Sequence, residues 1–560
     1  MGFTPSSKTP HGPHDSHKYI LTRRPWRLNV TDFQTIIDFP YHGSGTSDDP
    51  YIVEWLENDL ENPKNYSEVL RWSTTALIAT MTLCVALASS AYSGTVGSLL
   101  AEFKCSHEVI TLGLSLMVLG YAVGPLLWAP ISESVGRRNI FLLSYTGYTI
   151  FTAGCCGSQN VWTLIILRFF TGLFGSSALC IPGGQIADMF KAELRGLGIG
   201  VFCLAPFIGP ALGPIIGGFL GDAADWRWVM GLLAIFGALL TLTAFIFMPE
   251  TYAPALLRAR AGRLSRATSM VYLTAEDAKN PVIFKELVKH ALLRPWVLLF
   301  REPIVFSLTV SNFVLLLKIM ITTNGFMKLY MSAIYGTLYL CFAAFPIVFQ
   351  ENRGWNAGVG GLGFTGVLVG LIVGILIICW DNKRYVRIYR ATDGFAPPEC
   401  RLPAVIAGGI SIVVGLAWFA ATDSPNIHWV VPIMAGAPFG AGFVMVFICC
   451  ANYLIDAYVI FAASVLAANS VMRSIFACVF PLFTTYMFND IGIHWGVAVP
   501  GFIALACLPF PVLFYVYGAK IRARCKYAAL AEEHLRSTKV NGNLSSQPST
   551  DFEENAITKV

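Results

Sequence analysis

The chain has 560 residues, of which 55% are hydrophobic and only 13% are charged, and the apolar residues form long blocks separated by short polar loops. A water-soluble chain of this length would divide into several domains with charged surfaces, so the composition excludes a soluble protein. The formal net charge of +5 matters less than the positions of the charges, because the Lys and Arg of the loops orient membrane helices.

The chain opens with a polar segment, residues 1–71, which carries no signal peptide, so we expect it to remain in the cytosol as a tail. Its end, Glu61–Ser67 (ENPKNYS), is followed by Arg71 and Trp72. This pattern predicts a turn, a short amphipathic piece and an aromatic anchor at the membrane surface. The first transmembrane helix is therefore expected to begin at Trp72.

At about 20 apolar residues for each crossing, the apolar blocks predict twelve transmembrane helices. The hydrophilic residues 249–302 divide them into two sets of six, at 72–248 and 303–518, and residues 519–560 form a second cytosolic tail. We therefore expect an all-α polytopic membrane protein with two six-helix bundles and a cytosolic central loop. The predicted spans are Trp72–Tyr92, Val109–Ile131, Ile140–Gly157, Trp162–Pro182, Gly196–Gly221, Trp228–Met248, Ile304–Phe349, Gly361–Trp380, Pro403–Ala421, Trp429–Cys450, Phe461–Phe488 and Gly496–Gly518.

Most basic residues lie in the loops on the side of the N-terminus, which supports an inside N-terminus. The opposite loops hold little more than Lys104, Arg227 and Arg353. The central loop carries Arg258, Arg260, Arg263 and Arg266. We interpret these four arginines as a face near anionic lipid rather than as a nucleic-acid site.

The fifth predicted span holds five glycines and two prolines within Gly209–Gly221, GPALGPIIGGFLG. In water each interior Gly destabilises a helix by about 1 kcal/mol and each Pro by about 3 kcal/mol relative to Ala. In a bilayer the segment stays helical, because only a helix satisfies the hydrogen bonds of its backbone there. Gly209, Gly213 and Gly217 follow at i, i+4 and i+8, so they form a bare stripe for close helix packing, beside prolines that loosen the hydrogen-bond ladder. Ordinary small-residue packing and a helix that rocks against a partner both remain open.

This segment resembles the GxxxGPxxGG antiporter motif in the fifth span of major facilitator superfamily exporters. The matching residues are Gly209, Gly213, Pro214, Gly217 and Gly218, with Pro210 beside them. The segment Glu61–Ser67 is similar to the ENPxNW segment of fungal drug:proton antiporters with twelve spans. The resemblance covers most of Glu61–Gly518, and it implies a major facilitator fold in which two six-helix bundles transport by alternating access.

The loop Gly124–Arg138 joins the second and third spans and resembles the GxLaDrxGRR loop of the superfamily. Glu133 stands where the family has Asp, Gly136 lies at the turn, and Arg137 and Arg138 lie at the inner face. A carboxylate at a helix end can hold a base or a helix dipole in one conformation and release it in the other. The resemblance implies a conformational latch, and a solvated loop whose arginines only set the topology is the alternative.

Arg168 in the fourth span matches the RxxxG pattern that the family associates with proton coupling. A guanidinium in a membrane faces a water-filled cavity or a partner, unless it snorkels to the nearby outer interface. Asp188 at the inner end of this span, and the PETYAP segment Pro249–Pro254, are similar to hallmarks of fungal drug antiporters. Asp188 and Glu133 could each titrate or form a plain salt bridge in an inner loop.

The candidates for substrate contact are Tyr92, Tyr335, Tyr339 and Phe342. The last three follow at i, i+4 and i+7, and an aromatic wall of this kind suits flat apolar or cationic compounds. Packing or contact with lipid is the alternative. Asn469 and Arg473 in the eleventh span lie one turn apart, so they line the cavity or form an interhelical hydrogen bond. We see no buried acid cluster of the kind that a polyamine carrier needs.

The stretch before Gln350 is too long to cross the membrane once, and two crossings would place the bases of 383–390 outside. Deleting Val310–Lys328 leaves a stretch that resembles the family's seventh span without a gap. A valine codon begins with GT and a lysine codon can end in AG, as at the ends of an intron. A translated intron that damages the transporter is one interpretation, and a genuine re-entrant or interfacial insertion is the other.

The resemblance implies a proton-coupled antiporter that exports drugs, toxins or secondary metabolites, and not an enzyme. The alternative is a polyamine or nutrient facilitator or importer of the same superfamily. A membrane receptor or scaffold would need a larger tail domain, and no GxxxxGK[ST] loop for ATP hydrolysis occurs. The partners that we expect are a small amphipathic organic substrate, protons and the lipid bilayer, without nucleic acid.

We expect a monomer in the plasma membrane, in preference to the vacuolar membrane. Most of the fourteen cysteines lie in apolar runs, and none forms a metal-ligand spacing. The sequence therefore predicts no disulfide framework, no metal site and no cofactor.

Overall fold

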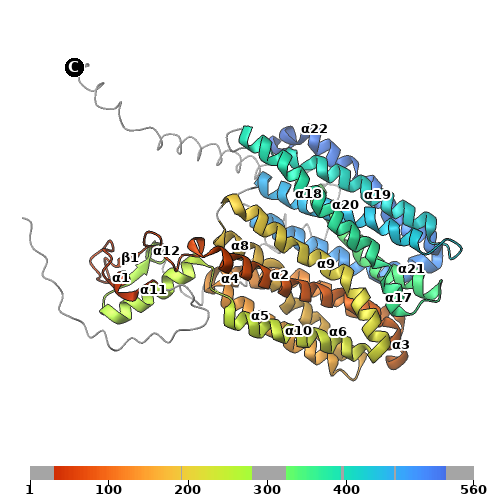
Figure 1. Cartoon of the computed structure of the whole chain (residues 1–560), viewed down its shortest axis with the longest axis horizontal. Helices are drawn as coiled ribbons and strands as arrows, with labels where there is room; N and C mark the ends of the chain where they lie inside the picture. Colours follow the sequence, from red (N-terminus) through yellow and green to blue (C-terminus); the bar gives the residue numbers. More distant parts are fainter. Residues whose placement is uncertain (1–30, 191, 280–322, 392–396, 459–461, 525–560) are drawn as a thin grey trace, which may run out of the picture.

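The computed structural model describes residues 31–190, 192–279, 323–391, 397–458 and 462–524, as long helices with a small unit at one end (Figure 1). Ten described segments are long and apolar enough to cross a membrane. The helix α5 (Arg137–Cys156) adds a crossing whose first turn holds two arginines, and the 50-residue stretch Asn469–Gly518 contains two crossings, because the backbone breaks at Gly492. The helices therefore account for the twelve predicted spans.

Each half of the chain supplies six crossings. The N-half consists of α2 (Glu68–Ala91) with η3 (Tyr92–Thr95) and α3 (Val96–Phe103), α4 (His107–Val135), α5, α6 (Val161–Gly175) with α7 (Ser177–Cys180) and α8 (Pro182–Met189), α9 (Ala192–Ala224) and α10 (Trp226–Phe247). The C-half consists of α16 (Thr323–Phe345) with the π-helical turn η4 (Pro346–Glu351), α17 (Ala357–Gly361) with α18 (Phe364–Ala391), η5 (Pro398–Arg401) with α19 (Leu402–Thr422), α20 (Val430–Tyr458), α21 (Ala462–Cys507) and α22 (Pro509–Arg524).

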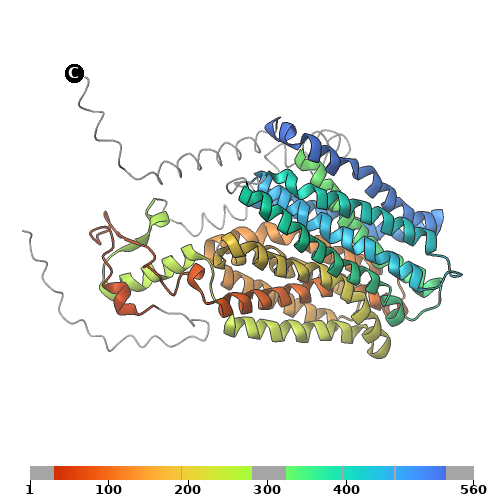
Figure 2. The same ribbon diagram turned by 45° about the horizontal axis from the view of Figure 1, so that its top comes forward.

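The two halves lie side by side, as both views of the molecule show (Figures 1 and 2). Helix α9 of the N-half packs against α17 and α18 of the C-half, and α4 packs against α21. One continuous apolar core runs through both halves. We call the end of the bundle near α8 the inner end and the end near α17 the outer end, following the orientation predicted from the charges.

The seventh crossing is a single helix in its described part. Helix α16 begins at Thr323 and continues through η4 to Glu351, so one crossing reaches the outer end. Residues 323–328, the last part of the proposed insertion, belong to this helix, whereas residues 310–322 lie outside the described part of the chain. The intron hypothesis therefore stays a prediction.

A small unit built from the N-terminal tail and the central loop extends beyond the inner end of the N-half (Figure 1). Its elements are α1 (Phe33–Ile37), β1 (Tyr51–Val53), η2 (Pro63–Asn65), α11 (Ala253–Thr268), β2 (Tyr272–Thr274) and α12 (Ala275–Lys279). The strands β1 and β2 pair in parallel, with Tyr51 opposite Tyr272. A separate apolar core formed by Ile36, Val53 and Leu264 holds this tail–loop unit together.

The tail–loop unit corrects our interpretation of the central-loop arginines. Arg260 is fully buried and binds Asp59 and Glu61 of the tail at 2.6 and 2.8 Å. Arg263 reaches the same Glu61 at 3.1 Å, and Arg258 binds Asp277 at 2.9 Å. These arginines face carboxylates of the unit, so a lipid-facing surface made of all four is wrong.

Candidate functional site

The glycine stripe of α9 packs against α2 within the N-half. A Cβ added at Gly209 would lie against Ala86, and one added at Gly213 or Gly217 would collide with the backbone of Ala91. Only glycine therefore permits this approach of the two helices. The helix continues unbroken through Pro206, Pro210 and Pro214, as the bilayer argument predicts.

The opposite side of α9 contacts the C-half at the outer end. A Cβ at Gly218 would meet the backbone of Ala357, and a Cβ at Gly361 would meet the backbone of Pro214. The backbone N–H of Gly358 donates to the Asp222 carboxylate at 2.8 Å. The glycine-rich helix is thus close-packed on both sides, against its own half and against the other one.

A second outer contact joins α4 to α21, because the His107 ring nitrogen Nδ1 lies 3.4 Å from the Thr485 hydroxyl. With the α9 contacts, it brings the outer ends of the two halves together. In this structure the boundary between the halves is therefore closed at its outer end.

The inner end of the N-half holds an ion network at the predicted latch. Arg137 Nε lies 2.6 Å from the Asp188 carboxylate at the end of α8. The Glu250 carboxylate accepts the backbone N–H groups of Arg137 and Arg138 at 3.0 and 3.1 Å, and it also accepts the N–H of Thr251. Glu250 thus satisfies the free donors at the first turn of α5, where the helix dipole favours an anion.

The structure does not bring Glu133 into this network by direct contact. Its side chain is exposed at the end of α4, whereas Gly136 turns the chain with φ of 115° and lies against Glu250. The carboxylates that hold the latch arginines are Asp188 and Glu250. Sequence reasoning noted the Pro249–Pro254 segment but gave Glu250 no role, since its partners are more than 100 residues away.

The tail–loop unit touches this latch at two points. Tyr66 donates its hydroxyl to the Glu250 carbonyl at 2.9 Å, and Arg258 donates to the Ser134 carbonyl at 3.2 Å. Burial alone raises the pKa of Asp59, but hydrogen bonds from Arg260 and Thr31 outweigh it, and the pKa ends below its ordinary value. The unit is therefore anchored by charges that are ionised near neutral pH.

The C-half carries an ion pair at the corresponding place. Arg401, at the start of α19, binds Asp456 near the end of α20 at 3.0 Å, and its guanidinium lies 3.6 Å from the centre of the Tyr385 ring. The Tyr385 hydroxyl also reaches Asp456, at 3.5 Å. The two residues of this pair lie 55 positions apart, so no single segment of the sequence predicts their contact.

Arg168 is buried rather than snorkelling, since only 1% of its surface is exposed. Its guanidinium donates to three backbone carbonyl oxygens, those of Gly113 at 2.8 Å and of Ala88 and Ser89 at 3.3 Å. The Tyr92 ring covers it at 4.2 Å. Arg168 therefore ties α6 to α2 and α4, and its charge is met by carbonyl dipoles and an aromatic face.

The predicted aromatic residues of α16 are buried at the boundary between the halves, which excludes contact with lipid. The Tyr339 hydroxyl lies 3.1 Å from the Ser89 hydroxyl of α2. The Tyr335 and Tyr339 rings lie 5.2 Å apart, and Phe342 follows at 5.2 Å from Tyr339. The structure thus brings these three residues together and places them against the N-half. Tyr92 packs on Arg168 and also lines a small pocket together with Phe342.

Two phenylalanines that the sequence did not single out extend this aromatic cluster. Phe443 and Phe447 of α20 lie 6.3 and 6.0 Å from Tyr335. Phe207 of α9 contacts both of them, at 5.6 and 4.9 Å. Because Phe207 belongs to the other half, the rings bridge the boundary. The sequence could not single out these phenylalanines, because single Phe residues are common in apolar spans and only the packing of the helices brings them together.

Asn469 and Arg473 of α21 lie beside this cluster. The Arg473 guanidinium covers Tyr335 and Phe447 at 4.7 and 4.9 Å from the ring centres. It also donates to the Ser470 hydroxyl at 3.4 Å. The side-chain amide oxygen Oδ1 of Asn469 and the Nε of Arg473 are buried, and neither has a hydrogen-bond partner among the described residues.

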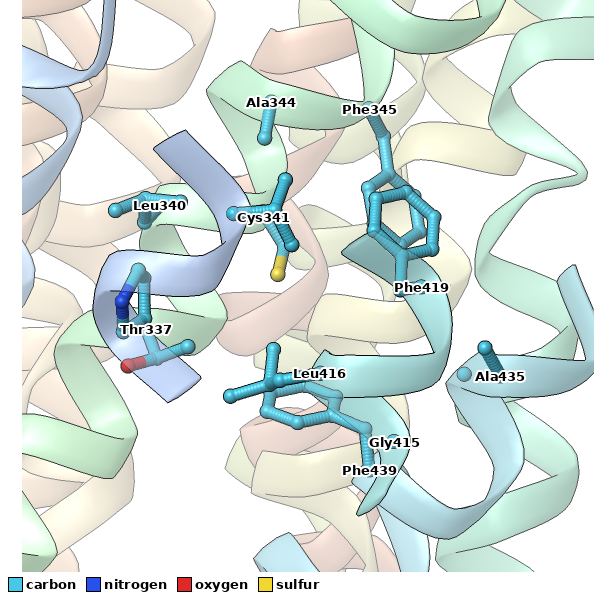
Figure 3. Close-up of a pocket in the computed structure, with 13 residues that line it drawn as sticks. Thr337, Leu340, Cys341, Ala344, Phe345, Gly415, Leu416, Phe419, Ala435 and Phe439 are labelled. Carbon is cyan, nitrogen blue, oxygen red and sulfur yellow. The ribbon is translucent and has the colours of Figure 1, made fainter. Parts of the chain in front are cut away.

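A pocket lies inside the C-half between α16, α19, α20 and α21 (Figure 3). Its wall is apolar, and the Phe345 and Phe419 rings stack across it at 5.0 Å. Its volume of about 20 Å³ is far below the roughly 300 Å³ that an organic ligand needs. This pocket is a packing defect of the C-half, and the boundary between the halves remains the candidate site.

The part of the chain that the structure describes contains no group of three or more His, Cys, Asp or Glu side chains that could hold a metal ion. The thirteen cysteines within it are all free thiols. The candidate site therefore consists of aromatic rings, two arginines and hydroxyl groups.

Comparison with known proteins identifies the family to which this architecture belongs. The family model "Major Facilitator Superfamily" matches residues 78–481. The major facilitator superfamily multidrug transporter mdrA of Aspergillus fumigatus is 54% identical over 533 residues, which cover 94% of this chain and 84% of that protein. The MFS-type efflux pump MFS2 of Trichophyton rubrum is 53% identical over 527 residues, which cover 93% of this chain and 85% of that protein.

Solved structures agree on the fold. The xylose transporter XylE of E. coli, in a partially occluded inward-open conformation, has a TM-score of 0.54 at 16% identity and covers 80% of this chain and 99% of its own. The human organic anion transporter MFSD10 has a TM-score of 0.51 at 16% identity, with 80% and 100% of the two chains covered. The chain therefore belongs to the major facilitator superfamily, as a secondary transporter of two six-helix halves and not an enzyme.

Proposed function

We propose that this protein exports small amphipathic organic compounds, such as drugs, toxins or secondary metabolites, in exchange for protons. The observation that carries the proposal is the aromatic cluster at the boundary between the halves. Tyr339 of the C-half contacts Ser89 of the N-half, and Tyr335 and Phe207 pack on the same ring, that of Phe447. Flat apolar compounds stack on such rings. The names of the relatives, a multidrug transporter and an efflux pump, support export as the direction.

Alternating access is the mechanism that fits two bodies with a closed outer boundary. Opening that boundary would separate Asp222 from Gly358 and His107 from Thr485, and it would move α9 against α17. The stripe Gly209, Gly213 and Gly217 would stay on α2, so we place the moving contact of α9 at Gly218. The ion pairs of the inner end lie within one half each, so opening the outer boundary does not by itself break them.

For proton coupling we propose Arg168 and the latch residues. Arg168 lies beside the cluster and fixes α6 to α2, so a change in its carbonyl partners would reach Ser89 directly. Asp188, which binds the Arg137 guanidinium, and Glu250, which accepts the backbone N–H groups of Arg137 and Arg138, are the carboxylates whose protonation would loosen the inner end.

Transport into inverted plasma-membrane vesicles tests the proposal. The chain is expressed in a yeast host that lacks its own exporters, and rhodamine 6G is supplied outside the vesicles with an imposed proton gradient. We expect accumulation that stops when a protonophore collapses the gradient, and none in vesicles without the protein. Gradient-independent movement, or movement of spermidine instead of rhodamine 6G, would support the polyamine or nutrient facilitator.

We also propose that the protein works as a monomer in the plasma membrane. Each half meets the other within one chain, and the whole candidate site is supplied by that chain. A fluorescent fusion at the native expression level should label the cell periphery, and the purified protein in detergent should have the mass of one chain. A vacuolar signal or a stable dimer would overturn this part.

A further inference from the structure

The charges inside the predicted spans are all positive. No predicted span contains Asp or Glu, whereas Arg168 and Arg473 lie well inside the fourth and eleventh spans. A guanidinium in a membrane is costly unless carbonyls, water or an anion meet it, so each of these arginines requires an explanation. The two have different surroundings, and the difference indicates a role.

Arg168 is satisfied by the protein itself, through three backbone carbonyls and the Tyr92 ring. Arg473 has one weak donation to Ser470 at 3.4 Å, and its Nε has no partner among the described residues. It is also only partly buried. One guanidinium is therefore a completed structural contact, whereas the other has a donor without a partner in the described part of the chain, at the boundary between the halves.

The groups around Arg473 combine aromatic faces with hydrogen-bonding atoms. Tyr335 and Phe447 lie under the guanidinium, and Phe207 continues the same aromatic surface into the N-half. The buried carbonyl oxygen of Asn469, one turn earlier, offers an acceptor to a hydroxyl group. Free guanidinium donors beside aromatic faces match a carboxylate attached to an aromatic ring, since Arg binds carboxylates through two parallel N–H groups.

We propose that Arg473 recognises the acidic group of the cargo, and that the preferred cargo is an aromatic carboxylate. The proposal rests on the export function proposed above and names its substrate class. The ring of the cargo lies on Tyr335, Phe447 and Phe207, and its carboxylate binds the donors that Arg473 leaves free. A cationic compound meets no carboxylate in any predicted span, so it binds through its apolar surface alone.

The test compares two probes of the same shape, 2-naphthoate and the uncharged 2-naphthamide. Their initial rates of uptake into inverted vesicles are measured over a concentration series, with rhodamine 6G as a third substrate and vesicles without the protein as background. We expect the wild-type KM for naphthoate to be at least ten-fold lower than that for naphthamide. The substitution Arg473→Gln should raise the naphthoate KM at least ten-fold and leave the naphthamide KM within two-fold.

Two further variants separate recognition from folding. Arg473→Lys keeps the charge but loses the planar fork, so we expect it to recover part of the naphthoate preference. Arg387→Gln removes the same charge at an exposed position of α18 and should behave as the wild type. The amount of each variant in the membrane is measured by immunoblot.

Each outcome decides one point. If Arg473→Gln affects naphthoate and naphthamide alike, the arginine is a structural residue or binds an inorganic anion or lipid phosphate, and the proposal is overturned. If the wild type transports rhodamine 6G but does not prefer naphthoate to naphthamide, export stands and this substrate class is wrong. If none of the three probes is transported, the proposed function fails together with the inference.

Discussion

The inner ends of the two halves carry the same device in different surroundings. In the N-half, Arg137 at the start of α5 binds Asp188 at the end of α8, and in the C-half Arg401 at the start of α19 binds Asp456 near the end of α20. Each pair thus joins the third crossing of its half to the fourth. The repeated architecture therefore supplies an ion pair to both halves at equivalent places.

The difference between the halves is the tail–loop unit. The N-half pair is reinforced by Glu250, whose carbonyl is in turn held by Tyr66 of the tail. The C-half pair, Arg401 and Asp456, is contacted by Tyr385, which belongs to the same half. The inner end of the N-half is thus braced by a second segment of the chain, whereas the described contacts at the inner end of the C-half come from its own helices.

The largest effect is expected from Arg260→Gln. The substitution leaves the buried Asp59 without its counter-charge and leaves Glu61 with Arg263 alone, and breaking a buried pair in this way costs about 3–5 kcal/mol. We expect the tail–loop unit to open, so that limited proteolysis cleaves the tail of the variant in membranes but not that of the wild type. Arg266→Gln, at an exposed position of the same helix, is the control. Equal protection of both variants would contradict the anchoring role.

A smaller effect is expected from Glu250→Ala, which leaves several N–H groups of the latch without their acceptor. Because Glu250 is only partly buried, water replaces part of what is lost, and the whole change costs about 1–3 kcal/mol. Transport velocity per amount of protein should fall at least ten-fold. Asp456→Ala in the C-half should reduce it less, and the opposite ranking would remove the distinction between the two halves.

The tail–loop unit should also respond to acid in a defined direction. The pKa of Asp59 in the folded unit is lowered, so its stabilising contribution is complete above the unfolded value of about 3.9 and is lost as the pH falls through the folded value. Proteolytic protection of the tail in permeabilised vesicles should therefore be constant from pH 8 to 5. It should decrease only below about pH 4, where an acid-stable protease is used. Loss of protection between pH 7 and 6 would contradict the assignment.

The smallest effect is expected from Tyr66→Phe. It removes one hydrogen bond to the Glu250 carbonyl, worth about 0.5–1.5 kcal/mol, and keeps the ring. Transport should fall by less than three-fold, with the tail still protected from protease. A complete loss of transport would show that the tail controls the latch directly rather than supporting it.

The sequence predicted the fold well, because long apolar blocks and the charges of the loops report crossings locally. It also placed Arg168, Asp188 and the glycine helix in their spans. It missed the tail–loop unit, whose strands have three residues each and whose partners are 221 residues apart, Tyr51 and Tyr272. Arg260 looked like part of an exposed basic face for the same reason, since Asp59 and Glu61 lie about 200 residues earlier.

The candidate site shows the same limit. A helical spacing predicted that Tyr335, Tyr339 and Phe342 share a face, but only the packing of α9 and α20 shows that Phe207 and Phe447 complete it. The resemblance assigned the latch acid to Glu133, whereas the fold presents Asp188 and Glu250 to the arginines. Contacts between distant segments are not encoded in any single segment.

The pairing of β1 with β2 has a consequence for biosynthesis. Strand β1 leaves the ribosome first, and β2 emerges only after the six crossings of the N-half have been made. When the two strands meet, they close the first half into a finished body at a time when the second half has not yet been translated. The nascent chain can therefore complete one half of the carrier before it begins to insert the other.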